Sequence, residues 1–162
     1  MPDLRVPASS ANLGPGFDAL GLALGIYLDC RFERSSTFSI QVTGRDADCI
    51  PTGPENLIWR TALAVARDVG EELPNISLAI HNDIPLGKGL GSSAAALTAG
   101  VVIADHLIGL HWKRLRILDE AAQIEGHPDN VAACVLGSIV ATALLPKNWL
   151  KSLRLPNAFE RT

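Results

Sequence analysis

A glycine-rich segment followed by two serines has the residue types best suited to chemistry. Gly87, Gly89 and Gly91 alternate with larger residues, and Ser92 and Ser93 follow directly. Because glycine lacks a Cβ and tolerates positive φ, such a loop can bring backbone N–H groups close to an anion. The hydroxyls and unpaired N–H groups at the start of a following helix would add to the attraction for phosphate. The spacing fits a phosphate-binding loop, although an ordinary glycine turn capped by serine explains the same residues.

Two common nucleotide-binding motifs do not fit this loop. Lys88 precedes Gly89, so the order required by a Walker A loop is not found, and the spacing is not that of a Rossmann fingerprint. A second segment, Glu125 to Asn130, brings together a carboxylate, a histidine and an amide. Since Mg²⁺ prefers hard oxygen ligands and keeps several waters, one carboxylate and a serine hydroxyl would suffice to hold it on a phosphate. Taken alone, Glu125 is more simply explained as a solvated carboxylate at a helix end.

Alternating apolar residues predict the strands that position the loop. Positions 22 to 32 carry an apolar residue at every even number, which is the period of a strand with one buried face. A shorter alternation at 38–42 follows a polar turn, so we expect these two strands to pair as an antiparallel hairpin. A third alternation covers 76–80 and leads toward the glycine loop.

Three further segments have the pattern of helices. Apolar residues from Leu57 to Val69 recur every three or four positions and stop at Gly70. The alanine-rich segment 94–107 is typical of a buried helix, and another helix is expected over 112–124. Residues 135–145 are predicted to form a further buried strand. The mixture of strands and helices predicts an α+β fold, in which a strand, the glycine loop and a helix follow one another.

Composition limits the classes of protein and partner. The chain has 162 residues, of which 48% are hydrophobic, which suits one domain with one core. A formal net charge of -3 argues against nucleic acid as a partner. Cys30, Cys49 and Cys134 are widely spaced and are expected to be reduced thiols. The longest apolar run, 131–145, is shorter than the roughly 20 residues of a membrane helix, so we expect a soluble, cytoplasmic protein with no membrane partner.

Three segments of the sequence resemble motifs of the GHMP kinase family. The glycine loop is similar to the phosphate-binding motif of that family, P-x-x-x-G-L-G-S-S-A-A. The residues that carry this similarity are Pro85, Leu86, Gly87, Lys88, Gly89, Leu90, Gly91, Ser92, Ser93, Ala94 and Ala95. Two other segments, 7–18 and 125–132, narrow the resemblance to the homoserine kinases within the family. The resemblance extends over residues 5–142.

This resemblance implies both a fold and an activity. The fold is that of a GHMP kinase N-terminal domain, a ribosomal-protein-like βαβ fold with a mixed sheet and packed helices. The activity is transfer of the γ-phosphoryl group of ATP, with Mg²⁺, to the side-chain hydroxyl of L-homoserine, a step on the route to threonine. Phosphoryl transfer depends mainly on positioning and on neutralising phosphate charge, so a strong general base is not obligatory.

Roles for individual residues follow from the resemblance. The loop at 85–95 would bind ATP, and the adenine would lie near Asn56 and Leu57, although a role for Asn56 as a helix cap is equally well supported. Homoserine would contact Asn12, Asp18, His127 and Asn130. Catalysis would involve Ser93, Glu125 and Asn130. Mg²⁺ would bind Ser92 and Glu125, with Asp119 or Glu120 as alternatives to the glutamate.

The resemblance covers only about the first half of a family member. We therefore divide the chain into an ATP-binding domain at 1–145 and a truncated or divergent tail at 146–162. The expected C-terminal domain, with arginines that bind the homoserine carboxylate, is not found in the sequence, so impaired turnover is expected. The chain could associate with such a half or form a homodimer. A non-catalytic remnant that retains nucleotide binding, or a GHMP kinase for another small alcohol, are the alternative functions.

Overall fold

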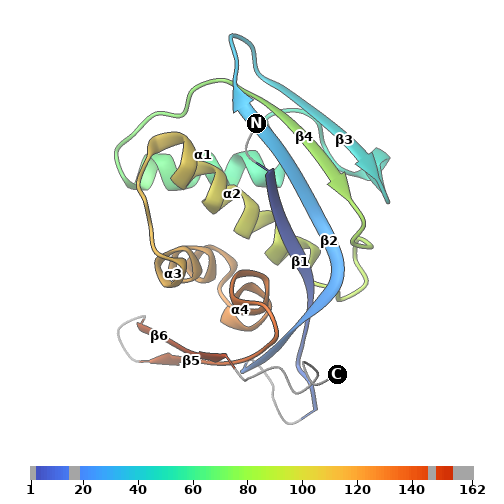
Figure 1. The fold of residues 1–162 in the computed structure, drawn as a ribbon, viewed down its shortest axis with the longest axis vertical. Helices are drawn as coiled ribbons and strands as arrows, with labels where there is room; N and C mark the ends of the chain where they lie inside the picture. The colour runs from blue at the N-terminus through green and yellow to red at the C-terminus, as the bar shows by residue number, and fades with distance from the viewer. Residues whose placement is uncertain (1–2, 15–18, 146–148, 155–162) are drawn as a thin grey trace.

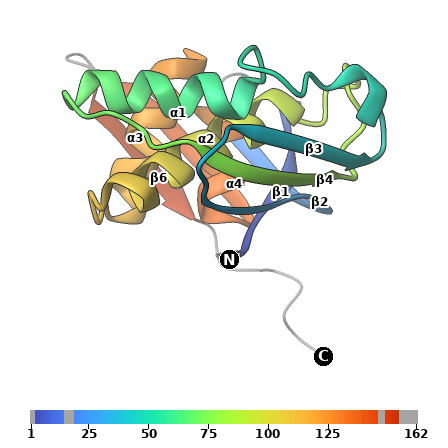
Figure 2. The same ribbon diagram turned by 90° about the horizontal axis from the view of Figure 1, so that it is seen from above.

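The computed structural model of the chain describes residues 3–14, 19–145 and 149–154. A mixed β-sheet forms one layer, and the α-helices lie on one of its faces (Figures 1 and 2). Helices α2 and α4 contact strands β1 and β2, while α1 packs on α2 and α3 packs on both α2 and α4. This arrangement confirms the α+β fold expected from the sequence.

Along the chain, three strands come first, α1 and α2 flank β4, three helices follow one another, and two strands end the order. The strands are β1 (Asp3–Ala11), β2 (Leu20–Arg34), β3 (Ser39–Gly44), β4 (Ile76–Asn82), β5 (Ile139–Leu145) and β6 (Trp149–Arg154). The helices are the 3₁₀ turn η1 (Ala47–Cys49) and α1 (Leu57–Asp68), α2 (Ser92–Ile108), α3 (Arg114–Glu125) and α4 (Pro128–Leu136). The predicted strands at 22–32 and 76–80 and the three predicted helices are therefore confirmed.

The long strand β2 organises the sheet. The strand order is β3-β4-β2-β5-β6, and β1 pairs with β2 as well. All pairs are antiparallel except β3 with β4, which run parallel. The predicted buried face is found where β2 crosses the core, at Leu28, Cys30 and Phe32.

The predicted hairpin between β2 and β3 is wrong. Strand β4 lies between them, and β3 pairs with β4 in parallel, with Ile40 opposite Leu78 and Val42 opposite Ile80. Alternation indicates which face of a strand is buried but not which strand is its neighbour. The connection from β3 to β4 contains η1 and α1, which is long enough for the crossover that parallel strands require.

Strand β1 and helix α4 were not predicted from the sequence, and neither were η1 and β6. The alternation in β1 is interrupted by a register shift between Pro7 and Ala8, so that Ala8 and Ser9 are both buried. Helix α4 begins with Pro128 at its first position, which suits the fixed φ of proline, and ends before Gly137 at φ 71. It takes up the start of the strand predicted at 135–145, so that β5 begins only at Ile139.

Close approach of elements at two glycines fixes the packing. A Cβ at Gly21 in β2 would overlap the carbonyl of Asp129 in α4. A Cβ at Gly100 in α2 would lie 2.5 Å from the Ile58 carbonyl oxygen and 2.6 Å from the Thr61 Cβ, both in α1. These contacts are tighter than real Cβ atoms show, so each glycine permits two backbones to approach.

Part of the segment predicted as a tail belongs to the sheet. Strand β6 pairs antiparallel with β5, from Val140 opposite Arg154 to Leu145 opposite Trp149. The division of the chain at residue 145 stays a prediction. Among the helices of the described residues, none is both long and apolar enough to cross a bilayer.

Candidate active site

The glycine loop ends where α2 begins, as the sequence predicts. Gly87, Gly89 and Gly91 all have positive φ, at 65, 71 and 66 degrees. The first helical hydrogen bond of α2 runs from the Ala95 N–H to the Gly91 carbonyl, so the N–H groups of residues 92–94 have no partner within the helix. Together with the helix dipole, these groups form a site that favours an anion such as phosphate.

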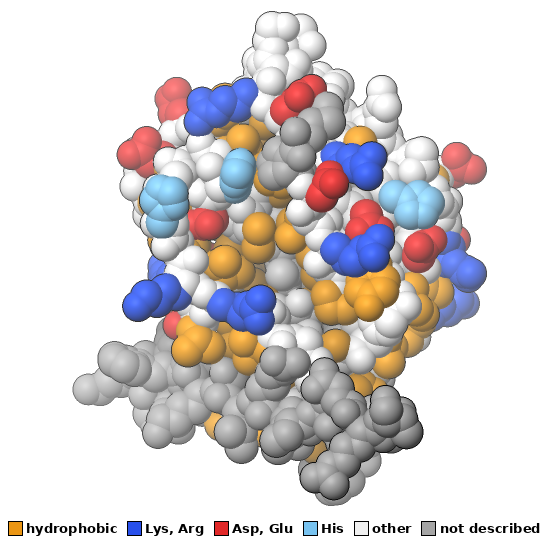
Figure 3. Space-filling model, in the orientation of Figure 1, with side chains coloured by type: hydrophobic (Ala, Val, Ile, Leu, Met, Phe, Trp, Pro, Cys, Tyr) orange, Lys and Arg blue, Asp and Glu red, His pale blue; other side chains and the backbone are white. Residues whose placement is uncertain are grey.

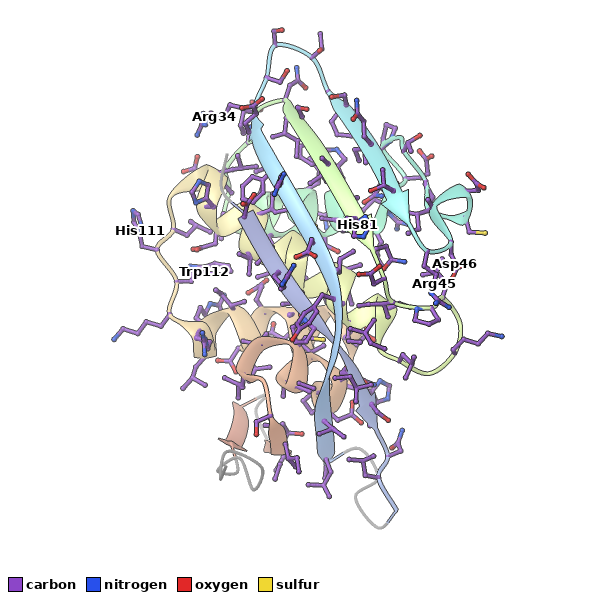
Figure 4. All side chains as sticks on the ribbon, turned by 45° about the vertical axis from the view of Figure 1, so that its right-hand side comes forward. Arg34, Arg45, Asp46, His81, His111 and Trp112 are labelled. Atoms are coloured by element: carbon purple, nitrogen blue, oxygen red, sulfur yellow. The ribbon has the colours of Figure 1, made fainter. Side chains whose placement is uncertain are left out.

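Two side chains outside the glycine motif hold the loop in place. Asn82, only 2% exposed, donates to the carbonyls of Arg45 and Ile84, each at 2.9 Å, and accepts from the Ile84 N–H at 3.2 Å. Asp46 accepts from the Leu86 N–H at 3.0 Å. Figure 4 shows Arg45 and Asp46 just beyond β3, beside the loop that follows β4. Through these hydrogen bonds, the turn after β3 holds the start of the loop in position.

A pocket of about 250 Å³ lies between the start of α1 and the start of α2. Most of its lining is apolar, and Ser92 and Ser93 belong to its wall. The lining residues are Leu28, Cys49, Ile50, Pro51, Asn56, Leu57, Ile58, Ile80, Asn82, Leu86, Ser92, Ser93 and Ala96. An apolar slot beside an anion site suits a molecule with a flat apolar ring and a phosphate chain.

Asn56 and Leu57, the residues expected near adenine, both line this pocket. Asn56 also caps α1, since its Oδ1 accepts from the N–H groups of Ile58 at 3.0 Å and Trp59 at 3.4 Å. Its Nδ2 donates to the Pro51 carbonyl at 2.7 Å. The capping role of Asn56 is thus observed, and a contact with a base stays a prediction.

Glu125, at the end of α3, reaches the start of α2. The Ser93 hydroxyl donates to Glu125 Oε2 at 3.4 Å, and both Ser92 and Ser93 line the pocket. Burial raises the pKa of the Glu125 carboxyl, and the hydrogen bond from Ser93 and the charge of His127 oppose that rise. No Lys or Arg of the described residues forms an ion pair with Glu125. A partly desolvated carboxylate of this kind, beside a serine hydroxyl and an anion site, fits one side of a Mg²⁺ site.

The two alternative carboxylates are less well placed for a metal. Glu120 is 6% exposed and forms an ion pair with Arg116 at 2.7 Å. Burial raises the pKa of Asp119, against the charge of the same arginine. Among the described residues, no group of three or more His, Cys, Asp or Glu side chains could form a metal site by itself. A metal ion here would therefore need oxygen atoms from serine, water or phosphate.

The residues expected to bind homoserine come from two chain segments. His127 is the exposed N-cap residue of α4, and Asn130 lies in the first turn of that helix. Asn130 is brought against the glycine loop, because its Oδ1 would lie 3.2 Å from a Cβ at Gly91. Asn12 is exposed after β1 and has φ 58, and Asp18 lies outside the described residues. The structure thus places Asn130 at the loop, and all four homoserine-binding roles stay predictions.

A larger groove, of about 590 Å³, lies on the face of the sheet that is opposite the helices. Figure 3 shows acidic, basic and histidine side chains interspersed over this face. Arg5 pairs with Asp29 at 2.7 Å, and Arg31 pairs with Asp3 at 3.0 Å. Because these charges neutralise one another, the groove has no field to attract a charged ligand, and the loop is the better candidate site.

Comparison with known proteins identifies the family of the chain. The family described as GHMP kinases N terminal domain matches residues 56–138, just over half of the chain. The chain belongs to the GHMP kinase family. Among curated relatives of the chain, a homoserine kinase of Solibacter usitatus is 69% identical over 153 residues, 94% of this chain and 50% of the relative. A homoserine kinase of Moorella thermoacetica is 46% identical, over 88% of this chain and 48% of the relative.

A solved structure supports the fold of the chain. The crystal structure of homoserine kinase from Cytophaga hutchinsonii aligns with a TM-score of 0.74 at 30% identity, over 95% of this chain and 52% of that chain. The chain spans about half the length of the curated relatives it matches. The resemblance inferred from the three motifs, and the fold that it implied, are confirmed.

Sequence reasoning missed three residues of the candidate site. Asp46 and Asn82 support the loop from outside its motif, and Ser9 contacts it from β1. Ser9 lies within the first motif segment, so the motif offered a signal for it. Asp46 and Asn82 are common turn residue types, and only the position of Asn82 directly before the loop could have pointed to a role.

Proposed function

We propose that this chain contains the nucleotide-binding part of an ATP-dependent homoserine kinase, which phosphorylates the side-chain hydroxyl of L-homoserine to give O-phosphohomoserine, toward threonine. The observation that supports it best is the joint geometry of the loop, the adjoining apolar pocket and the Ser93–Glu125 contact at 3.4 Å. The names of the relatives support homoserine as the acceptor.

In this proposal the chain acts mainly by positioning. The pocket beside Leu57 takes the adenine, and the N–H groups at the start of α2 orient the phosphates. Glu125 with Ser93 or Ser92 would hold Mg²⁺, which neutralises phosphate charge when it is bound. Asn130 and His127 orient the acceptor hydroxyl, whose oxygen attacks the γ-phosphorus as the bond to the β-phosphate oxygen breaks and ADP leaves.

The first test is ADP release by the purified chain with Mg²⁺, ATP and L-homoserine. Ser93→Ala is the test variant, and Ser36→Ala is the matched control, because Ser36 is exposed in the turn between β2 and β3. Homoserine-dependent turnover that is lost in Ser93→Ala but kept in Ser36→Ala supports the proposal. Turnover that depends on another small alcohol in a substrate panel would instead identify a GHMP kinase of different specificity.

A second candidate function is nucleotide binding without turnover. It is favoured by the pocket and by the adjoining start of α2, because these features would bind a nucleotide whether or not phosphoryl transfer follows. A ligand that binds only the folded state raises the unfolding temperature, so Mg²⁺–ATP should stabilise the chain in either case. Stabilisation without ADP release in the same preparation selects the binding function, and the absence of both contradicts each proposal.

The role of Glu125 can be tested through binding alone. Without a metal, its carboxylate repels the phosphates, so Glu125→Gln should bind ATP more tightly than the parent chain in EDTA. With Mg²⁺ the carboxylate becomes a ligand, so the same variant should bind ATP more weakly than the parent. Calorimetric titration under both conditions measures this change of sign. If Glu125→Gln changes ATP affinity in the same direction in EDTA and with Mg²⁺, Glu125 is not a ligand of the metal.

A further inference from the structure

Ser9 lies where β1, the glycine loop and α4 meet. It is fully buried, at 0% exposure, and its hydroxyl donates to Asn130 Oδ1 at 2.9 Å. Its N–H donates to the Leu90 carbonyl at 3.1 Å, which ties β1 to the loop. The Cys134 Sγ lies 3.5 Å from the Ser9 hydroxyl. One small side chain therefore connects three elements that are remote in sequence.

The glycine loop is shaped to accept this side chain. A Cβ at Gly91 would overlap the Ser9 hydroxyl and lie 3.2 Å from Asn130 Oδ1. The side chains of Ser9 and Asn130 thus lie against the last loop residue before α2. Asn130 is half-buried, and its own N–H is bound to Asp129 Oδ1 at 2.7 Å. Among the described residues, the Asn130 side-chain amide forms its hydrogen bond with Ser9, so the rotation of that amide depends on the Ser9 hydroxyl.

We propose that Ser9 is a positioning residue for phosphoryl transfer, which fixes the side-chain amide of Asn130 beside the N-terminus of α2. This inference rests on the proposed function, in which Asn130 contacts the acceptor hydroxyl. Ser9 is buried behind Gly91 and Asn130 and acts through them. Its hydroxyl holds Asn130 Oδ1 toward β1, so the Asn130 NH₂ group is directed away from Ser9 and is available to an acceptor oxygen. Reaction rates fall steeply when a group that orients the reacting atoms is misplaced.

A double-mutant cycle tests the kinetic part of this inference. Ser9→Ala should lower kcat about tenfold, because one hydrogen bond that orients a reacting group is lost, and it should leave the KM for ATP unchanged. In the Asn130→Ala background, Ser9→Ala should have no further effect on kcat, because the group that it orients is gone. Ser10→Ala is the matched control on the neighbouring position of β1. Equal losses from Ser9→Ala in both backgrounds would show a structural role only and overturn the proposal.

A measurement without ligand separates this inference from the proposed function. The side-chain NH₂ resonances of Asn130, identified by their loss in Asn130→Ala, should shift and broaden in Ser9→Ala and stay unchanged in Ser10→Ala. If the parent chain shows no turnover, the proposed kinase function of the chain fails, and this spectrum alone decides whether Ser9 fixes the amide. An unchanged Asn130 resonance in folded Ser9→Ala overturns the proposal.

Discussion

Substitution of Gly91 by alanine should show how tightly the loop is built against the rest of the fold. Gly91 has φ 66, and a Cβ there would overlap the Ser9 hydroxyl and lie 3.1 Å from the Ser9 carbonyl oxygen. Gly89 has nearly the same backbone, with φ 71, but a Cβ there would meet nothing within 4 Å. Gly89→Ala is therefore a control that carries the backbone strain of the substitution without its contacts.

The two substitutions should differ in cost by a predictable amount. Alanine in the left-handed region destabilises the folded state by about 1–2 kcal/mol. The lower conformational entropy of the unfolded chain offsets about 0.4–1 kcal/mol of this, so Gly89→Ala should destabilise the protein by about 1 kcal/mol. Gly91→Ala adds about 1–3 kcal/mol for overpacking against Ser9. Displacement of the buried Ser9 hydroxyl adds about 1 kcal/mol for the lost bond to Asn130. We expect Gly91→Ala to cost about 2–4 kcal/mol more than Gly89→Ala.

Urea denaturation without nucleotide measures this difference. Shortening Ser9 to alanine in the Gly91→Ala chain removes the atom that the new Cβ meets. The double variant should thus be at least about 1 kcal/mol more stable than the sum of the single effects predicts. Equal costs for the substitutions at 89 and 91, together with additivity of the Ser9 and Gly91 effects, would refute the close contact between β1 and the loop.

Three other substitutions test the core and the carboxylate. Gly100→Ala gains about 1 kcal/mol of helix propensity but should still lower the thermal unfolding temperature, because its Cβ would meet the Ile58 carbonyl at 2.5 Å; a rise would contradict the observed packing. Thr98→Val should raise the free energy of unfolding in urea by about 1 kcal/mol, since the buried Thr98 hydroxyl has no hydrogen-bond partner among the described residues; a loss would mean that the hydroxyl is satisfied. Because burial raises the pKa of Glu125, the stability due to its protonated form is present at acidic pH and is lost as pH rises through the folded-state pKa. Glu125→Gln should therefore be more stable than the parent at neutral pH, with the difference vanishing in acid, as thermal unfolding across pH would show; a constant difference would argue against a raised pKa.

Local pattern was sufficient to predict many of the elements of this fold but not which elements are neighbours. The alternation in β2 and β4 and the periodicity of α1 reflect which side chains face the core, so each element was predicted at nearly its observed bounds. The partner of β3 depends on the crossover through α1, which the sequence of β3 does not contain. Helix α4 was missed because its small residues and initial proline give little periodic signal over a short length.

The same distinction holds for the candidate site, whose local features could be predicted from the sequence and whose long-range contacts could not. The sequence predicted that the loop glycines tolerate positive φ and that a helix begins close to Ser92 and Ser93, and the structure has both features. The contact of Ser93 with Glu125 joins residues 32 positions apart, and that of Ser9 with Asn130 joins residues 121 apart. Such contacts follow from how the helices pack on the sheet, so no local pattern could have predicted them.

The burial of α2 links the fold to the chemistry of the loop. From Ala94 to Leu107 most of the helix is buried against α1, α3, α4 and the sheet, whereas Ser93 at its start is exposed. The small side chains that allow this packing also keep solvent away from the body of the helix, so its dipole is screened less than that of a surface helix. An anion at the first turn would therefore interact with a helix dipole that protein atoms shield from solvent along its length. Ala99, Gly100 and Ala104, which do not line the pocket, would thereby strengthen the attraction for phosphate at the loop.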